Sequence, residues 1–227
     1  MYTRTELLIG QEKLDKLKSS AVLVLGLGGV GGYAAEALAR AGVGRLGICD
    51  FDRVDITNKN RQILALDSTI GKLKADVSEA RLRDINPELQ IEKFAFRIDE
   101  ETLSGLHIGD WDFIADCIDD TKAKLMVIKT AKEQGVPMIS SMGTGNKMMD
   151  PGRFRVCDIE ETEGDPLAKY MRKALRKLEI KDVKVLFSDE LPMHPGARPI
   201  PTISYMPAIA GLNIAAYIIK QLISAEK

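Results

Sequence analysis

Four glycines near the start of the chain are spaced for phosphate binding. Gly26, Gly28 and Gly31 follow the pattern G-x-G-x-x-G, and Gly29 lies inside it. Without side chains, glycines let the backbone approach a phosphate closely, and a helix starting there presents free N–H groups and a partial positive charge. Asp50 follows at about the 20-residue separation at which an acid accepts hydrogen bonds from ribose hydroxyls. The pattern predicts a bound nucleotide without identifying it.

The polar segment after Asp50 offers side chains for a nucleotide. It reads F-D-R-V-D-I-T-N-K-N-R-Q and would lie at the carboxyl end of a strand, where α/β sheets bind ligands. Asn58 and Gln62 can hydrogen-bond a nucleotide, and Arg61 can bind a phosphate through two parallel hydrogen bonds. A hydrophilic surface loop would have the same composition, so this pattern alone leaves both interpretations open.

Lysines and carboxylates add charge to the same predicted edge. Lys72 and Lys74 lie near a helix start, where a cation opposes the helix dipole, so each needs a nearby anion or exposure to water. Asp119 and Asp120 end an apolar run, and a carboxylate there can hold Mg²⁺ through one or two oxygens. Capping the helix that begins at Thr121 is the competing role for Asp120.

A second group of charges follows Asp165-Pro166, a typical helix start. Apolar residues recur on one face of this predicted helix. The opposite face carries five basic residues: Lys169, Arg172, Lys173, Arg176 and Lys177. Such a face can contact a phosphate backbone, as in tRNA, or it can simply be solvated, and the pattern does not decide between the two.

Strands and helices alternate along the chain. The predicted strands are Val22–Leu25, Leu46–Cys49, Leu89–Phe96, Asp112–Asp120, Pro137–Met142, Arg153–Ile159 and Lys184–Ser188. The predicted helices include Thr5–Leu17, Val30–Ala41, Glu100–Leu106, Thr121–Gln134 and Ala208–Ile223. This alternation predicts an α/β fold with a Rossmann-like, mostly parallel sheet and helices on both faces. We expect one domain, 1–227, with a nucleotide-binding core (1–150) and an extension (151–227) that completes the sheet and a subunit interface.

Composition limits the classes of function. The chain has 227 residues, 45% of them apolar, and a net charge of −1, so only a local patch could bind a polyanion. Its three cysteines, Cys49, Cys117 and Cys157, form no C-x-x-C pair, which fits a reducing cytoplasm and argues against a zinc ribbon. The N-terminus lacks the apolar stretch of a signal peptide.

Two C-terminal segments have distinctive patterns. The run Thr202–Ile219 has no formal charge, but it contains Pro207, Gly211 and Asn213, so we expect a buried helix or subunit interface rather than a stable membrane anchor. The segment 191–201 is rich in proline and predicts a semi-rigid extended loop that crosses the ligand face. His194 in this loop is a weak catalytic candidate.

Five motifs in order resemble the adenylating domain of the ubiquitin-activating-type, ThiF-like superfamily. They span residues 1–145 and comprise G-L-G-G-V-G, Asp50 with Asp52, N-K-N-R-Q at Asn58–Gln62, G-K-L-K at Gly71–Lys74 and D-C-I-D at Asp116–Asp119. Within the superfamily the chain looks most similar to the bacterial tRNA threonylcarbamoyladenosine dehydratases. That likeness is carried by N-R-Q-I-L-A-L at Asn60–Leu66, I-N-P-E at Ile85–Glu88, M-G-T-G-N-K-M-M-D-P at Met142–Pro151, D-P-L-A-K at Asp165–Lys169 and V-L-F-S-D-E at Val185–Glu190.

The resemblance implies a site for ATP and Mg²⁺. The phosphates would lie over Gly26–Gly31 and the ribose at Asp50, and Asp119 would carry Mg²⁺. The triphosphate would be held by Asn58, Arg61 and Lys74, with Asp52 and Gln62 also contacting the nucleotide. Arg4 alone would be read as a solvated side chain, but it matches an N-terminal arginine that reaches the phosphates of a partner subunit, which implies a homodimer.

The implied reaction is an ATP-dependent dehydration. The carboxylate of threonylcarbamoyladenosine, beside the tRNA anticodon, becomes an acyl-adenylate, and its own carbamoyl group then expels AMP and closes a ring. Adenylation depends mainly on positioning and charge neutralisation, so no protein nucleophile is required.

Three other functions compete with this one. Adenylation of a sulfur-carrier protein is the first, but relatives with that activity usually carry paired C-x-x-C motifs, and this chain has no cysteine after Cys157. Sulfur-transfer accessory proteins nevertheless remain candidate partners. An NAD-dependent oxidoreductase would leave Arg61, Lys74 and Asp119 unexplained. A non-enzymatic nucleotide-binding scaffold would not need these residues together with Arg4.

Overall fold

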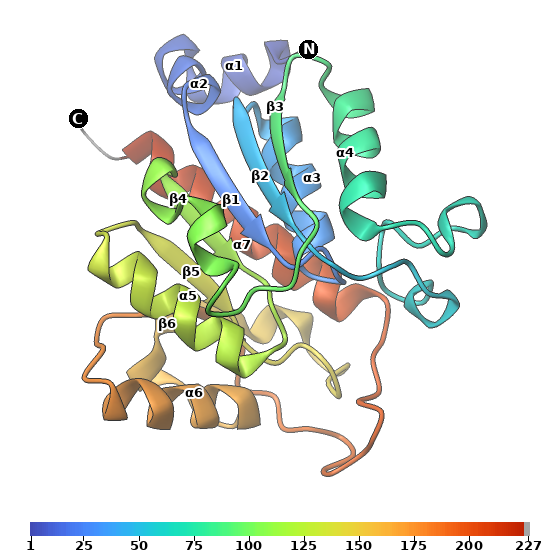
Figure 1. The fold of residues 1–227 in the computed structure, drawn as a ribbon, viewed down its shortest axis with the longest axis vertical. Coiled ribbons are helices and arrows are strands. Elements are labelled where there is room, and N and C mark those ends of the chain that lie inside the picture. Colours follow the sequence, from blue (N-terminus) through green and yellow to red (C-terminus); the bar gives the residue numbers. More distant parts are fainter. Residues whose placement is uncertain (225–227) are drawn as a thin grey trace.

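The computed structural model describes residues 1–224, which are organised around a seven-stranded sheet (Figure 1). The strand order is β3-β2-β1-β4-β5-β7-β6. The strands are β1 (Ala21–Leu25), β2 (Arg45–Cys49), β3 (Gln90–Phe94), β4 (Phe113–Asp116), β5 (Met138–Ser141), β6 (Phe154–Asp158) and β7 (Lys184–Ser188). Every pairing is parallel except that of β6 with β7, so the predicted mostly parallel α/β sheet is confirmed.

The strand order reverses beside β1. Val22 pairs with Leu46 of β2 on one side and with Phe113 of β4 on the other. The connections that follow β1 and β4 therefore run in opposite directions along the sheet. This leaves a crevice between the carboxyl ends of the two strands. Open α/β sheets bind ligands at such a switch point.

Seven α-helices cover the sheet within residues 1–224. They are α1 (Thr3–Ile9), α2 (Gln11–Lys18), α3 (Gly31–Ala41), α4 (Lys74–Ile85), α5 (Thr121–Glu133), α6 (Pro166–Lys177) and α7 (Tyr205–Ser224). Short 3₁₀ turns lie at η1 (Ile56–Asn58), η2 (Asp67–Thr69), η3 (Leu103–Leu106), η4 (Ile108–Asp110), η5 (Pro151–Arg153) and η6 (Ile159–Glu161).

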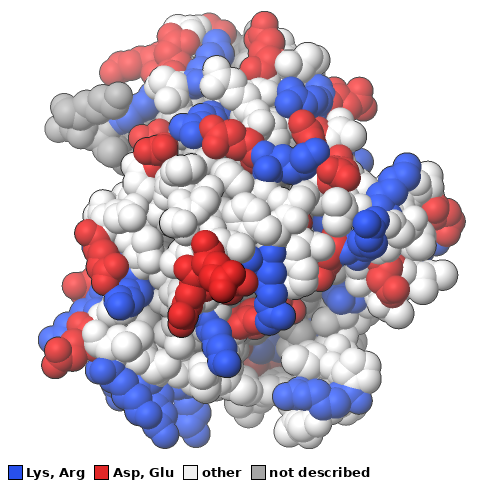
Figure 2. Space-filling model, in the orientation of Figure 1, with Lys and Arg blue, Asp and Glu red and all other residues white. Residues whose placement is uncertain are grey.

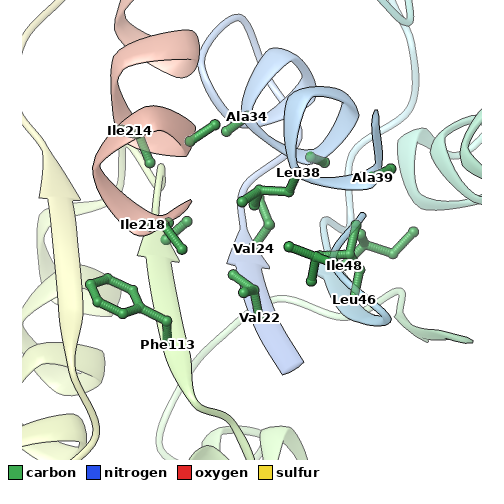
Figure 3. Close-up of a cluster of buried hydrophobic side chains, with 14 of the residues drawn as sticks. Val22, Val24, Ala34, Leu38, Ala39, Leu46, Ile48, Phe113, Ile214 and Ile218 are labelled. Atoms are coloured by element: carbon green, nitrogen blue, oxygen red, sulfur yellow. The ribbon is translucent and has the colours of Figure 1, made fainter. Parts of the chain in front are cut away.

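Alternating residues of β1 build a core on each face of the sheet. Val22 and Val24 pack in one cluster with Leu38 of α3 and Ile218 of α7 (Figure 3). Leu23 and Leu25 point the other way, into a cluster that also contains apolar side chains of α5 and α6. Because both faces are covered, β1 is apolar at every position, as expected of a buried parallel strand.

The leading segment differs from its prediction as one helix over Thr5–Leu17. It forms two helices, α1 and α2, because the backbone at Gly10 takes a φ of 85°, in the left-handed region that ends a helix. The spacing of Leu7, Leu8, Leu14 and Leu17 predicts one buried apolar stripe. Leu14 and Leu17 are buried, whereas Leu7 and Leu8 are 82% and 85% exposed. The predicted apolar stripe is therefore wrong for its first half.

Two other predicted helices differ in type or in starting residue. The predicted short helix over Glu100–Leu106 reduces to the 3₁₀ turn η3. Helix α7 begins at Tyr205 rather than Ala208, and Pro207 lies in its first turn, where no intrahelical N–H is needed. In the part of the chain that is described, α7 alone is long and apolar enough to span a membrane, and half of its apolar window is buried. Ile214 and Ile218 of α7 are fully buried in the core, as in a soluble protein's central helix.

Candidate functional site

The glycine loop joins β1 to α3 at the switch point. Gly26 has a φ of 82°, and its N–H donates to the carbonyl of Cys49 at 2.8 Å. A Cβ atom at Gly26 would lie 2.8 Å from the Cys117 carbonyl oxygen, and one at Gly31 only 1.8 Å from the Gly26 carbonyl oxygen. Side chains are excluded at both positions, so the loop can pass close to a ligand and lead directly into the N-terminus of α3.

Asp50 connects the glycine loop to the next loop. Its Oδ2 accepts from the N–H of Leu27 at 2.7 Å, and its Oδ1 accepts from that of Asp52 at 2.8 Å. Burial raises the pKa of the Asp50 carboxyl, and this outweighs the opposing effects of Lys74 and the two N–H donors. Each oxygen keeps a second lone pair, so the geometry is compatible with the predicted ribose contact.

Lys74, the first residue of α4, already has an anionic partner. Its Nζ lies 2.8 Å from Oδ2 of Asp52 and 3.9 Å from Oδ2 of Asp50, and its side chain is only 7% exposed. Lys72 is exposed, so each lysine satisfies one of the two predicted conditions. Lys74 therefore places a positive charge at the carboxyl edge, beside Asp50.

Asn58 and Arg61 lie in a tight turn after β2. Oδ1 of Asn58 accepts from the N–H of Asp55 at 3.1 Å, which closes the capping box of η1. The half-buried Arg61 donates from Nη1 to the Thr57 carbonyl at 3.0 Å and to Oδ1 of Asn60 at 2.8 Å. These bonds use one guanidinium nitrogen, so the others remain able to bind a phosphate.

Gln62 contributes an unpaired polar atom. Its side chain is buried, and within residues 1–224 its Oε1 has no hydrogen-bond partner. Its Nε2 lies 3.7 Å from the position of a Cβ at Gly28, so the carboxamide is beside the glycine loop. A buried unpaired polar atom costs about 1–3 kcal/mol. A nucleotide donor or a bound water at this loop would remove that cost, which fits the predicted role of Gln62.

The two carboxylates after β4 have different roles. Oδ1 of Asp120 accepts from the N–H groups of Lys122 and Ala123 and caps α5, so the competing interpretation is correct for Asp120. Asp119 is exposed, and its carboxylate forms no hydrogen bond with another described residue. The preceding peptide, Cys117–Ile118, packs against Gly26, which places Asp119 next to the glycine loop.

The donor set at this edge suits Mg²⁺ bound to a nucleotide. Among residues 1–224 no three His, Cys, Asp or Glu side chains cluster as a metal site. Mg²⁺ is usually held through one or two carboxylates together with substrate phosphates. Asp119, exposed and next to the glycine loop, meets that requirement.

Below these loops lies a fully buried ion pair that the sequence did not reveal. Oδ2 of Asp116 accepts from Nζ of Lys124 at 2.9 Å and from Oγ of Ser140 at 2.6 Å, and both charged side chains are 0% exposed. Oδ1 of Asp116 accepts from the N–H of Ile118 at 3.1 Å. The Asp116 side chain thus satisfies both a backbone group and neighbouring side chains, and the pair fixes the turn that leads to Asp119.

Replacing Lys124 with methionine is expected to destabilise the protein by about 3–5 kcal/mol, because Asp116 would keep a buried charge without its partner. Urea unfolding measures this loss, with the exposed Lys129→Met variant of the same helix as control. A loss below about 1 kcal/mol would contradict the assigned burial of the pair.

Arg4 is not brought to the other predicted residues of its own chain. It is exposed on α1, beside Tyr2, whose hydroxyl donates to the carbonyl of Ala39 near the C-terminal end of α3. Helix α3 starts at the glycine loop and has 11 residues, so about 16 Å of helix separates its two ends. Arg4 could therefore contact only phosphates that are bound to another subunit.

The basic helix α6 is present, but its charges differ in availability. Arg172 donates to the backbone and hydroxyl oxygens of Thr162, and Arg176 forms an ion pair with Glu160. In the described part of the chain, the remaining basic residues on this face have no ion-pair partner. They are Lys169, Lys173 and Lys177, all exposed and spaced by four residues. Basic side chains gather over α6 at the lower left of Figure 2.

Two buried charges beyond β5 were also missed. Nζ of Lys147 donates to Oδ2 of Asp165 and to the Ser188 carbonyl, both at 2.7 Å. Glu190 accepts from the N–H groups that follow Lys147. Burial would raise the pKa of Glu190, but those N–H groups and Lys147 hold it below its usual value. Lys147 and Glu190 lie in the motifs that resemble the tRNA threonylcarbamoyladenosine dehydratases. This resemblance is the one sequence signal that could have identified them.

Comparisons with known proteins agree over the length of the chain. The family model described as ThiF family matches residues 2–227. The tRNA threonylcarbamoyladenosine dehydratase of Bacillus subtilis is 41% identical over 240 residues, covering 98% of this chain and 94% of the relative. The solved structure of the E. coli tRNA N6-threonylcarbamoyladenosine dehydratase TcdA in complex with ATP has a TM-score of 0.92 and 30% identity, and the match covers 98% of this chain and 93% of that one.

A relative with a different activity matches a shorter region. The molybdopterin-synthase adenylyltransferase of Haemophilus influenzae is 38% identical over 126 residues, which cover 56% of this chain and 51% of that protein.

Proposed function

This chain belongs to the ThiF family, and we propose that it is an ATP-dependent enzyme that dehydrates threonylcarbamoyladenosine in tRNA to its cyclic form. The observation that carries the proposal is the extent of similarity. The Bacillus subtilis dehydratase matches 98% of the chain, and so includes the buried Lys147 and Glu190 and helix α6. The match to the molybdopterin-synthase adenylyltransferase spans 56%.

ATP would bind with its phosphates over Gly26–Gly31 and its ribose at Asp50. Arg61 and Lys74 would balance phosphate charge from the same chain, and Arg4 from a second subunit. Mg²⁺ held by Asp119 would neutralise further charge on the phosphates. These cations stabilise the negative charge that develops as the substrate carboxylate attacks the α-phosphate and pyrophosphate leaves.

The second step needs no protein nucleophile. The carbamoyl group attacks the carbonyl carbon of the acyl-adenylate and releases a proton to solvent, AMP leaves with the bonding electrons, and the ring closes with net loss of one water. Burial, together with the charge of Asp116, raises the pKa of the Cys117 thiol to about 12, although Lys124 opposes the shift. That thiol is therefore protonated at neutral pH and is a poor nucleophile.

A homodimer in the cytoplasm is the setting that we propose. Leu7 and Leu8 are exposed on α1 beside Arg4, which suits a subunit interface that delivers Arg4 to a partner's phosphates. Sulfur-transfer proteins remain candidate accessory partners.

The alternative activity is adenylation of a sulfur-carrier protein, favoured by the match to the molybdopterin-synthase adenylyltransferase over 126 residues. Mass spectrometry of tRNA nucleosides after incubation with ATP and the purified protein separates the two. We expect threonylcarbamoyladenosine to lose one water as AMP is released, without any carrier protein. Unchanged tRNA, together with ATP consumption that requires a carrier protein, would establish the alternative.

For the basic helix, we predict that Lys173→Glu with Lys177→Glu weakens tRNA binding and makes its salt dependence less steep. Each lost phosphate contact lowers the slope of log affinity against log salt by about 0.7–0.9, so two contacts give roughly 1.5. Arg176 is a poorer choice because it is already paired with Glu160. Filter binding over a salt series gives the slope. The control variant, Lys13→Glu with Lys220→Glu, makes the same charge change elsewhere on the surface. Equal slopes in the two variants would mean that the basic face of α6 is solvated and does not contact tRNA.

A further inference from the structure

The proline-rich segment 189–204 connects β7 to α7 without helix or strand, and one residue of a distant loop holds its middle part, from Met193 to Pro201. That residue is Asn146, which follows β5. Its side chain pairs with His194: Nδ2 donates to the His194 carbonyl at 2.7 Å, and Oδ1 accepts from the His194 N–H at 2.9 Å. Its backbone N–H donates to the Pro201 carbonyl at 2.6 Å, and its carbonyl accepts from the N–H of Met193 at 2.9 Å. All the polar groups of Asn146 are thus engaged with the segment.

The backbone of Asn146 is arranged for these contacts. Its φ is 60°, in the left-handed region that asparagine tolerates better than most residues. At Gly145, an added Cβ would lie 2.8 Å from Cγ2 of Ile200, so the backbone there packs directly against the side chain of Ile200. The loop after β5 therefore contacts the segment closely at both Gly145 and Asn146.

The other end of the segment is tied to the nucleotide side of the sheet. Nδ2 of Asn60 lies 3.2 Å from the Thr202 carbonyl oxygen, and Oδ1 of Asn60 accepts from Arg61. Just beyond the segment, the Cβ of Pro207 lies 2.9 Å from the position of a Cβ at Gly29. The segment thus spans the carboxyl edge of the sheet, from the loop after β5 to the phosphate-binding loops.

We propose that Asn146 is a positioning residue, which fixes segment 189–204 as a wall of the site where the RNA carboxylate meets ATP. The inference rests on the proposed function. The substrate must approach the α-phosphate over this edge, and a fixed wall lowers the entropy cost of orienting it. The wall also keeps water from an acyl-adenylate, which would otherwise hydrolyse before the ring closes.

Asn146→Gly tests the role of the side chain, because glycine keeps the positive φ and loses only the two bonds to His194. We expect kcat/KM for tRNA to fall roughly tenfold or more, because the segment loses both side-chain hydrogen bonds that position it. The dissociation constant of ATP, measured by calorimetry, should stay within about twofold, because Asn146 does not contact the nucleotide loops. Amide hydrogen exchange at Met193 and His194, measured without RNA, should become faster by a similar factor.

Glu179→Gly is the matched control. Glu179 has a φ of 56° and lies after α6, so the substitution makes the same kind of backbone change away from the segment. Exchange at Met193 and His194 and kcat/KM should match wild type in this control.

Wild-type exchange in Asn146→Gly, or ATP affinity that falls by the same factor as kcat/KM, would overturn the proposal. Failure of the wild-type protein to dehydrate tRNA would instead refute the proposed function, and the exchange measurement would still decide whether Asn146 holds the segment.

Discussion

Asp119→Ala is expected to abolish dehydration and leave the fold intact. The Asp119 carboxylate is exposed and makes no hydrogen bond to another described residue, so its removal should change stability by less than about 0.5 kcal/mol. As the proposed Mg²⁺ ligand, its loss should lower turnover by at least about a hundredfold. Turnover of modified tRNA and thermal unfolding of the same samples measure the two effects.

The neighbouring Asp120→Ala variant is a control of opposite character. It removes the N-cap of α5, so it should cost about 1 kcal/mol of stability and leave most of the activity. A near-normal turnover rate of Asp119→Ala would contradict both the role of Asp119 as a Mg²⁺ ligand and the proposed ATP-dependent dehydration.

Mixed dimers of Arg4→Ala and Asp119→Ala subunits should recover activity that both parent variants lack. If Arg4 acts across the interface, the subunit with Arg4→Ala keeps its own Asp119 and receives an intact Arg4 from its partner. One of the two sites is then complete, and we expect about half of the wild-type rate. The structure motivates the experiment because Arg4 lies at the end of α3 away from the glycine loop of its own chain.

Arg61 supplies the control for this experiment. Arg61 and Asp119 lie at the same edge of one chain, so mixing Arg61→Ala with Asp119→Ala subunits leaves a defect in each site and should restore nothing. Heterodimers can be verified by two affinity tags. An inactive Arg4→Ala/Asp119→Ala heterodimer would mean that Arg4 does not act across the interface.

The elements that sequence predicted well are those defined by local pattern. The β1–α3–β2 unit follows from apolar runs, the glycine spacing and Asp50, because each signal lies within a few residues of the next. The prediction of a single leading helix failed because the apolar spacing continues through Gly10. Only the observed φ of 85° shows that one helix ends there and another begins. Leu7 and Leu8 share the pattern of buried leucines but lack a partner within the described chain.

Contacts between distant residues could not be predicted. Lys74 and Asp52 are 22 residues apart, and Asn146 and His194 are 48 apart. Arg176 and Lys173 lie on the same predicted face of α6, and only the fold shows that the guanidinium of Arg176 is paired with Glu160. Asp120 was ambiguous between two roles because either uses an exposed carboxylate at a strand end, and hydrogen-bond geometry decided it.

If phosphate binds at Lys74 as proposed, the pairing of Lys74 with Asp52 makes this binding an exchange of one anion for another. Without a nucleotide, the ammonium group is already balanced by a carboxylate that is 52% exposed. An incoming phosphate must replace Asp52, which then turns to water with little further loss of hydration. Orthophosphate would gain little from that exchange, since one anion simply substitutes for another. A triphosphate that also reached the glycine loop and Arg61 would gain contacts that Asp52 does not make, so the proposed site would discriminate by the number of contacts rather than by charge.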